Sequence, residues 1–179
     1  MSAGTPGGID PVDRWREAGG EPDALPAEVR AALPAVLAAS DFVLESAMRE
    51  PGLVPGLAGS GALGRARAAG EIESLASGLA AAHGEETLFM DALRRLRRHE
   101  LVRIAWRDLA GLATLEETLR ELSSLADGAI RAALDFAARA LAPRYGTPRS
   151  AGGSAQELVV IGMGKLGGGE LNFSSPCSG

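Results

Sequence analysis

Apolar side chains recur every three or four positions through the middle of the chain, between residues 87 and 141. This spacing places them on a continuous face of an α-helix, and it is the strongest structural signal in the sequence. Gly111 interrupts the pattern, and Thr114 and Glu117 then form a capping box, the pairing that opens a helix. We therefore expect two long antiparallel helices that are joined near Gly111.

Prolines and glycines divide the first part of the chain into shorter segments. Over residues 27–39 the pattern predicts either a kinked helix or two short ones, because Pro34 lies inside it. Ser40 is a suitable N-cap for a helix that extends to Met48. A further helix is expected over residues 60–83, although four glycines weaken it.

Changes in composition suggest how the chain is divided. Pro143 should stop the second long helix, and the glycines and prolines that follow are typical of a linker. The expected parts are a flexible lead-in at 1–26, a helical region at 27–142, a linker at 143–156 and an incomplete core with an aberrant C-terminus at 157–179.

The composition excludes several classes of protein. The 179 residues have a formal net charge of −5, which argues against a nucleic-acid-binding protein. No stretch approaches the roughly 20 apolar residues of a membrane span, and the N-terminus lacks the features of a signal peptide. Cys177 is the only cysteine and there are two histidines, so neither a disulfide framework nor a clustered metal site is expected. We expect a soluble, cytoplasmic chain.

A glycine-rich turn follows the only credible strand. Residues 158–161 are a short apolar run, largely β-branched, as in a buried strand. Five of the next eight residues are glycine, so successive N–H groups can surround an anion, and Lys165, the only lysine, adds a positive charge. This pattern favours phosphate binding. The candidate phosphate-binding residues are Gly162, Gly164, Lys165, Gly167, Ser174 and Ser175.

Other interpretations of the turn are weaker or remain open. The spacing of Gly162, Gly164 and Gly167 matches a dinucleotide fingerprint, but only 12 residues follow Gly167, too few for the rest of that motif. A P-loop is also excluded, because Leu166 stands where Ser or Thr should follow the lysine. A tight structural turn without a ligand remains an alternative.

The string LVVIGMGKLGGGELNFSS at 158–175 closely resembles the signature of the glutamine synthetase adenylyltransferase family. These bifunctional enzymes add AMP to glutamine synthetase and remove it. Residues 93–109 and 145–148 are similar to segments that precede the signature in the N-terminal half of the family, and 40–42 and 49–51 fit its opening helices. The resemblance covers most of residues 30–175.

The resemblance implies a fold and an activity. It implies a mainly α protein, a helical bundle leading into the first strand and Gly-rich turn of a truncated α+β nucleotidyltransferase-like domain. In this half of the family, phosphate attacks the adenylyl-tyrosine linkage and releases ADP. The implied partners are glutamine synthetase, a PII-type signal protein, ATP or ADP, and phosphate, with Mg²⁺ as the cofactor of the complete enzyme.

The sequence departs from the family pattern after Ser175. The family continues into a strand with an Asp-x-Asp pair that holds Mg²⁺, whereas here Pro176 and Cys177 follow. Nucleotidyl transfer depends on cations that neutralise the charge developing on phosphate oxygens. We therefore expect a truncated chain that is inactive alone and has no metal ligands. The alternative is a non-catalytic helical interaction module with a structural glycine turn.

Six arginines in the first long helix resemble a basic face, but on a helical wheel they scatter around it. We expect them to be solvated or in salt bridges. Arg97 and Arg107 fall near the apolar face, and we expect them to reach solvent or to pair with Glu100.

Overall fold

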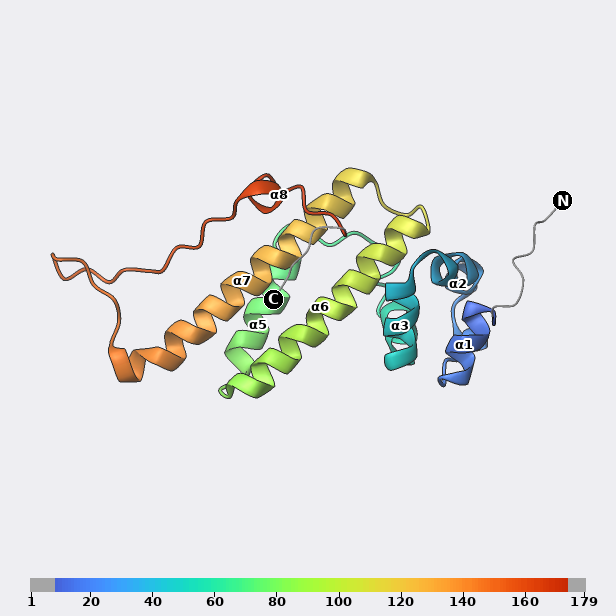
Figure 1. Cartoon of the computed structure of the whole chain (residues 1–179), viewed down its shortest axis with the longest axis horizontal. Helices are drawn as coiled ribbons and strands as arrows, with labels where there is room; N and C mark the ends of the chain where they lie inside the picture. Colours follow the sequence, from blue (N-terminus) through green and yellow to red (C-terminus); the bar gives the residue numbers. More distant parts are fainter. Residues whose placement is uncertain (1–8, 174–179) are drawn as a thin grey trace. The chain divides into compact units, whose positions relative to one another are not determined.

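The computed structural model describes residues 9–173, and this part of the chain is mainly helical (Figure 1). Its helices are α1 (Pro11–Glu17), the short 3-10 helix η1 (Pro22–Ala24), α2 (Ala27–Ala39), α3 (Asp41–Arg49), α4 (Leu53–Gly59), α5 (Glu71–Ala82), α6 (Glu86–Leu109), α7 (Leu115–Tyr145) and α8 (Gly164–Gly167). The helices divide between two compact units. Unit 1 comprises the chain up to residue 66 together with 101–114, and unit 2 comprises 67–100 together with the chain from residue 115, so α6 contributes to both.

Unit 1 is organised around Trp15, which lies within the expected flexible lead-in. Asp10 caps α1 by accepting a hydrogen bond of 2.7 Å from the Val12 N–H, and Pro11 starts the helix. Trp15 is fully buried in a cluster that includes Leu33 and Trp106. Residues 11–24 thus form α1, a turn and η1 where a flexible lead-in was expected, and the buried indole packs α1 into the core.

The helices between α1 and α6 follow the sequence pattern with one exception. α2 is a single helix that contains Pro34, and the Ser40 hydroxyl caps α3 by accepting from the Val43 N–H at 3.3 Å. The helix predicted over residues 60–83 is shorter than expected and begins only at Glu71. Gly61 and Gly70 have φ angles of 72° and 77°, a left-handed conformation that interrupts a right-handed helix.

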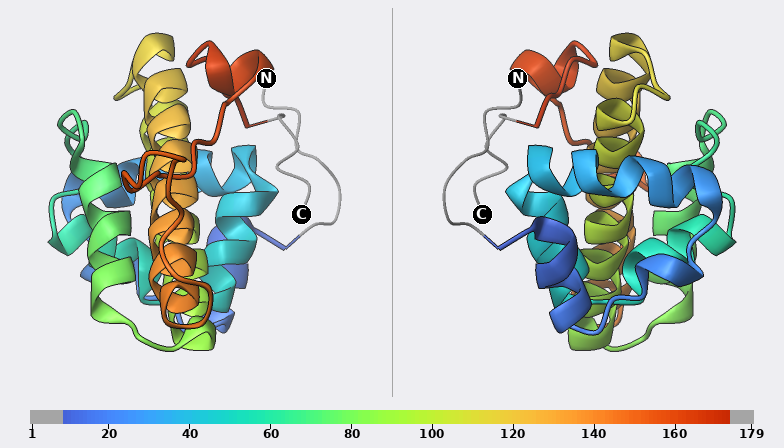
Figure 2. Two further views of the ribbon diagram at one scale, coloured as in Figure 1. Left: turned by 90° about the vertical axis from the view of Figure 1, so that its left-hand side faces the viewer. Right: turned by 90° about the vertical axis from the view of Figure 1, so that its right-hand side faces the viewer.

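Unit 2 consists of α5, the first part of α6, α7 and α8 with its flanking residues. The rings of Phe89 in α6 and Phe136 in α7 stack with centroids 4.4 Å apart and planes inclined by 6°. Gly128 lets α7 approach α5 closely, since a Cβ there would lie 3.1 Å from the Glu73 Cα. Figure 2 shows α5, α6 and α7 side by side. The two long helices expected from periodicity are therefore present.

The end of α7 lies later than predicted. Pro143 does not stop the helix, which continues to Tyr145. Gly146 then takes a φ of 77° and its N–H donates to the Ala142 carbonyl at 2.9 Å, which closes the final turn. A left-handed glycine, rather than the proline, ends this helix.

The buried strand predicted at residues 158–161 is not formed in the described part of the chain. These residues have no regular secondary structure, and Leu158 to Ile161 are 54 to 80% exposed. The one isolated β-bridge among residues 9–173 joins Arg149 and Ala155. A strand needs a neighbouring strand to pair its backbone, and the described residues do not supply one here.

No single helix within residues 9–173 is both long and apolar enough to cross a membrane. Only α2 and α3 taken together, with a bend of 115° between them, reach that length and composition.

Candidate functional site

The glycine-rich segment folds into a single helical turn, α8, with a glycine stop. The Gly168 N–H donates to the Gly164 carbonyl at 3.0 Å, and the Gly169 N–H donates to the Leu166 carbonyl at 3.1 Å. The Glu170 N–H donates to the Lys165 carbonyl at 2.7 Å, and Gly169 has a φ of 69°. This pair of bonds around a left-handed glycine is a Schellman motif. The N–H groups after Gly167 are therefore used inside the turn and do not point toward a common anion.

The same C-terminal glycine cap follows three other helices. Gly19, Gly61 and Gly111 follow α1, α4 and α6 with φ angles of 99°, 72° and 69°. In each case the glycine N–H bonds to the carbonyl three residues earlier, and the next N–H bonds to the carbonyl five residues earlier. Gly169 thus has a structural role that is independent of any ligand.

Two further glycines lie where the turn is closely packed. A Cβ at Gly167 would lie 2.6 Å from the Gly162 carbonyl oxygen, closer than van der Waals contact allows. A Cβ at Gly162 would lie 3.2 Å from the Leu166 Cγ. Gly164 has a φ of 58°, which favours glycine. The three glycines of the predicted site are therefore brought together in one tight turn.

Lys165 is exposed within this turn. Its side chain makes no hydrogen bond or ion pair with any of the residues that the structure describes, so its ammonium group is available to an anion. Ser174 and Ser175, which were also predicted to bind phosphate, lie outside the described residues. The structure thus groups Gly162, Gly164, Lys165 and Gly167.

The segment that leaves the turn contacts α7. The Leu171 N–H donates to the Ser123 Oγ at 3.3 Å, and the Ser123 hydroxyl donates to the Leu119 carbonyl at 2.9 Å. Ser123 is buried, with 7% of its surface exposed. Neither residue was singled out from the sequence, because this contact joins positions 48 residues apart.

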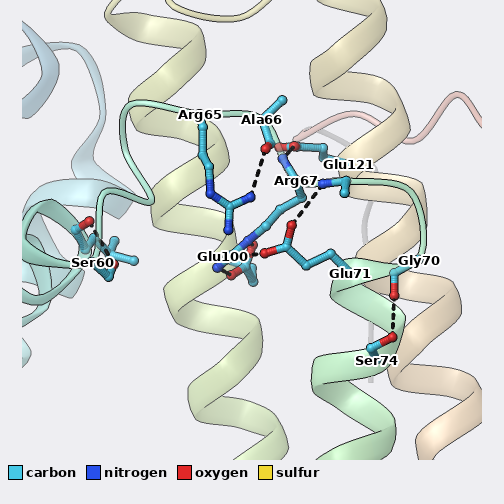
Figure 3. A network of polar contacts seen from close by, with 11 residues as sticks. Ser60, Arg65, Ala66, Arg67, Gly70, Glu71, Ser74, Glu100 and Glu121 are labelled. Carbon is cyan, nitrogen blue, oxygen red and sulfur yellow. Dashed lines mark hydrogen bonds and ion pairs between the residues drawn. The ribbon is translucent and has the colours of Figure 1, made fainter.

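A buried ionic cluster ties the segment before α5 to α6 and α7 (Figure 3). The Arg67 guanidinium binds Glu100 through two bonds, of 2.5 Å from Nη2 to Oε1 and 3.3 Å from Nε to Oε2. Its Nη1 donates to the Glu71 Oε1 at 2.6 Å, and its backbone N–H donates to the Glu121 Oε1 at 2.6 Å. Glu100 and Glu121 are each only 2% exposed. One arginine therefore organises carboxylates from three helices.

The carboxylates determine the ionisation of Arg67. Burial by itself lowers its pKa, but the hydrogen bonds and negative charges of Glu100 and Glu71 outweigh burial and raise the pKa above its ordinary value. Arg67 therefore stays charged, and the cluster is best described as a structural clamp.

The arginines of α6 do not all behave as expected. Arg94 is exposed and pairs with Asp91 at 2.9 Å, in agreement with a solvated ion pair. Arg103 and Arg107 are instead buried, at 0% and 4% exposed. Arg107 donates to the carbonyls of Leu63 and Leu112 at 3.0 and 2.9 Å. Arg107 is therefore bound to backbone acceptors outside α6, which a helical wheel of α6 cannot reveal.

The comparison with protein families decides what this chain is related to. Residues 30–177 match the family model of glutamate-ammonia ligase adenylyltransferase, a range that includes most of α2 and all of α3 to α8. The chain belongs to the glutamate-ammonia ligase adenylyltransferase family. The resemblance inferred from residues 158–175 and from the helical segments is therefore confirmed.

Curated relatives in this adenylyltransferase family carry the name bifunctional glutamine synthetase adenylyltransferase/adenylyl-removing enzyme. The relative from Thioalkalivibrio sulfidiphilus is 47% identical over 80% of this chain and 15% of its own length. The relative from Pseudomonas syringae is 45% identical over 86% of this chain and 16% of its own. The relative from Shewanella frigidimarina is 40% identical over 91% of this chain and 17% of its own length. The chain thus spans about one sixth of the length of these relatives.

The Mg²⁺ that the resemblance implies for this adenylyltransferase family does not fit the described residues. Within residues 9–173, no group of three or more His, Cys, Asp or Glu side chains could hold a metal ion. The three glutamates around Arg67 are already bound to its guanidinium or backbone. A groove of about 390 Å³ between α5 and α7 is lined by Glu73, Ser74, Ser77, Gly128, Arg131, Ala132 and Asp135. Its mixture of charges does not form a metal site either.

Proposed function

We propose that this chain supplies the helical part and the glycine turn of the half of a glutamine synthetase adenylyltransferase that removes AMP. The observation that carries the proposal is the family match over residues 30–177, together with the names of relatives that are 40 to 47% identical. The substrate would be glutamine synthetase adenylylated on a tyrosine, and a PII-type signal protein would regulate the complete, cytoplasmic enzyme.

The proposed reaction is a phosphorolysis. An oxygen of inorganic phosphate attacks the phosphorus of the adenylyl group, and the bond from that phosphorus to the tyrosine oxygen breaks. The tyrosine oxygen takes up a proton, and ADP is the other product. Lys165 would contribute a positive charge near the phosphate oxygens, where charge stabilisation supports the transfer.

The isolated chain is expected to bind ADP or phosphate but not to catalyse the phosphorolysis. None of its 179 residues forms an Asp-x-Asp pair, and a single lysine does not replace two carboxylates and a divalent cation. We expect no release of ADP when the purified chain is mixed with adenylylated glutamine synthetase and phosphate. ADP formation above the rate without protein would contradict this expectation.

A second candidate function is that of a helical interaction module. Gly162, Gly164, Gly167 and Gly169 each have a local structural reason, either a positive φ or close packing. This observation favours a turn that needs no ligand. The two functions differ in whether the turn binds phosphate.

Titration of the ¹⁵N-labelled chain with ADP and with inorganic phosphate separates the two. We expect shifts confined to the amides of residues 162–170 in the parent, and about tenfold weaker binding after Lys165→Ala, the size of a lost charge-assisted hydrogen bond. Arg14→Ala removes an exposed cation from α1, far along the sequence from the turn, and should bind as the parent does. Equal affinity of the parent and the Lys165→Ala variant, or no shift up to millimolar ADP, would favour the interaction module.

A further inference from the structure

Solvent exposure changes along the segment after α7. Every residue from 146 to 165 is exposed, whereas Leu166, Leu171 and Asn172 are only partly exposed. The segment therefore regains contact with the rest of unit 2 at the glycine turn and just beyond it. The chain leaves the C-terminal end of α7, loops outward and returns to the N-terminal half of α7 (Figure 1).

The returning segment forms a hydrogen bond with the buried hydroxyl of Ser123. Ser123 lies in a stretch of α7 in which residues 121–123 and 125 are all buried. Its Oγ accepts from the Leu171 N–H at 3.3 Å while its proton is donated to the Leu119 carbonyl at 2.9 Å. Since the hydroxyl both donates and accepts, both bonds can form at once.

A short segment with its own hydrogen bonds connects Leu171 to the glycine turn. Leu171 is six residues from Lys165, and the Glu170 N–H beside it closes the turn by donating to the Lys165 carbonyl at 2.7 Å. Gly169, between them, is held in the left-handed conformation by the Schellman motif. Fixing the Leu171 N–H on α7 therefore restricts the position of the whole turn.

We propose that Ser123 is a positioning residue for the glycine turn, holding it on α7 through the Leu171 N–H so that Lys165 is preorganised for phosphate. The inference deepens the proposed function and rests on it for the identity of the ligand. Ser123 does not touch the ligand itself. Its contribution is to reduce the conformational freedom that the turn would lose on binding.

Ser123→Ala tests this role because it removes the acceptor without creating a large cavity. Alanine has a higher helix propensity than serine, so the free energy of unfolding should change little or rise slightly. We expect amide exchange to accelerate about two- to tenfold at Leu171 and through residues 164–170, the range for one lost hydrogen bond. Ser124→Ala, at the next position of α7, is the matched control and should leave this exchange unchanged.

The same two variants are then titrated with ADP. Binding about two- to tenfold weaker after Ser123→Ala, with no change after Ser124→Ala, supports the positioning role. Unchanged amide exchange, or exchange that rises equally in both variants, overturns the positioning role. If the parent binds ADP, equal ADP affinity of the parent and the Ser123→Ala variant overturns it as well. If no protein binds ADP, the proposed nucleotide function fails, and the amide exchange alone still decides whether Ser123 holds the turn.

Discussion

Arg67 and Glu100, 33 residues apart in sequence, form a two-point ion pair in which the shorter contact is 2.5 Å. Glu100 is 2% exposed and the Arg67 side chain 14% exposed, so the pair is largely withdrawn from water. Glu71 and Glu121 add one contact each. The pair joins the segment before α5 to the middle of α6 and gives unit 2 a polar clamp beside its apolar core.

Replacing Arg67 with methionine should destabilise the protein strongly. Removing one partner of a largely buried ion pair costs about 3 kcal/mol or more, because the remaining carboxylates lose their main cation. Urea unfolding followed by far-UV circular dichroism measures the loss. Arg94→Met removes an exposed pair whose side chains are 64% and 67% exposed, and should cost at most about 1 kcal/mol. Similar losses in both variants would show that the clamp contributes no more than a surface pair.

Alanine at Gly167 should disturb the glycine turn, whereas alanine at Gly168 should not. The Cβ at Gly167 would lie 2.6 Å from a backbone oxygen, while the nearest atom to a Cβ at Gly168 is 3.6 Å away. Gly168 also has a right-handed conformation that alanine adopts readily. The ¹⁵N–¹H spectrum should change across residues 162–170 in the first variant and only near the substitution in the second. The opposite order would mean that the turn has another conformation in solution.

Alanine at Gly20 should destabilise unit 1. Its Cβ would lie 2.3 Å from the indole ring of Trp15, which is fully buried. Because the ring has no space to retreat, we expect a loss of about 2 kcal/mol or more, with a change in tryptophan fluorescence. Gly56→Ala, inside α4 with open space around it, should instead stabilise the protein by about 0.5 to 1 kcal/mol. A stabilising Gly20→Ala substitution would contradict the packing of Trp15.

Truncating Phe136 should weaken unit 2. Its ring stacks on Phe89 at a centroid distance of 4.4 Å and is 8% exposed. Loss of a buried phenylalanine ring costs about 3 to 5 kcal/mol, and urea unfolding of Phe136→Ala gives the value. Leu88→Ala is the control, since Leu88 is 54% exposed and its loss should cost at most about 0.5 kcal/mol. A loss below about 1 kcal/mol for Phe136→Ala would argue against this stack.

The candidate site was predictable in part. The glycines and Lys165 were identified from composition and from the family signature, because both are visible in a short string of residues. The hydrogen bond from the Leu171 N–H to Ser123 could not be predicted, since it joins an ordinary serine in a helix to a backbone N–H 48 residues away. The local reasons for Gly162 and Gly167 also emerge only when their atoms are seen in contact.

By itself, the sequence determined the long helices and the family, because helix periodicity and a glycine signature depend on residues a few positions apart. The tertiary structure decided that Trp15 anchors residues once expected to be flexible and that Arg107 is buried on backbone carbonyls. It also decided that residues 158–161 form no strand in the described part of the chain. These outcomes depend on which distant groups come into contact, because burial and strand pairing are properties of neighbours in space.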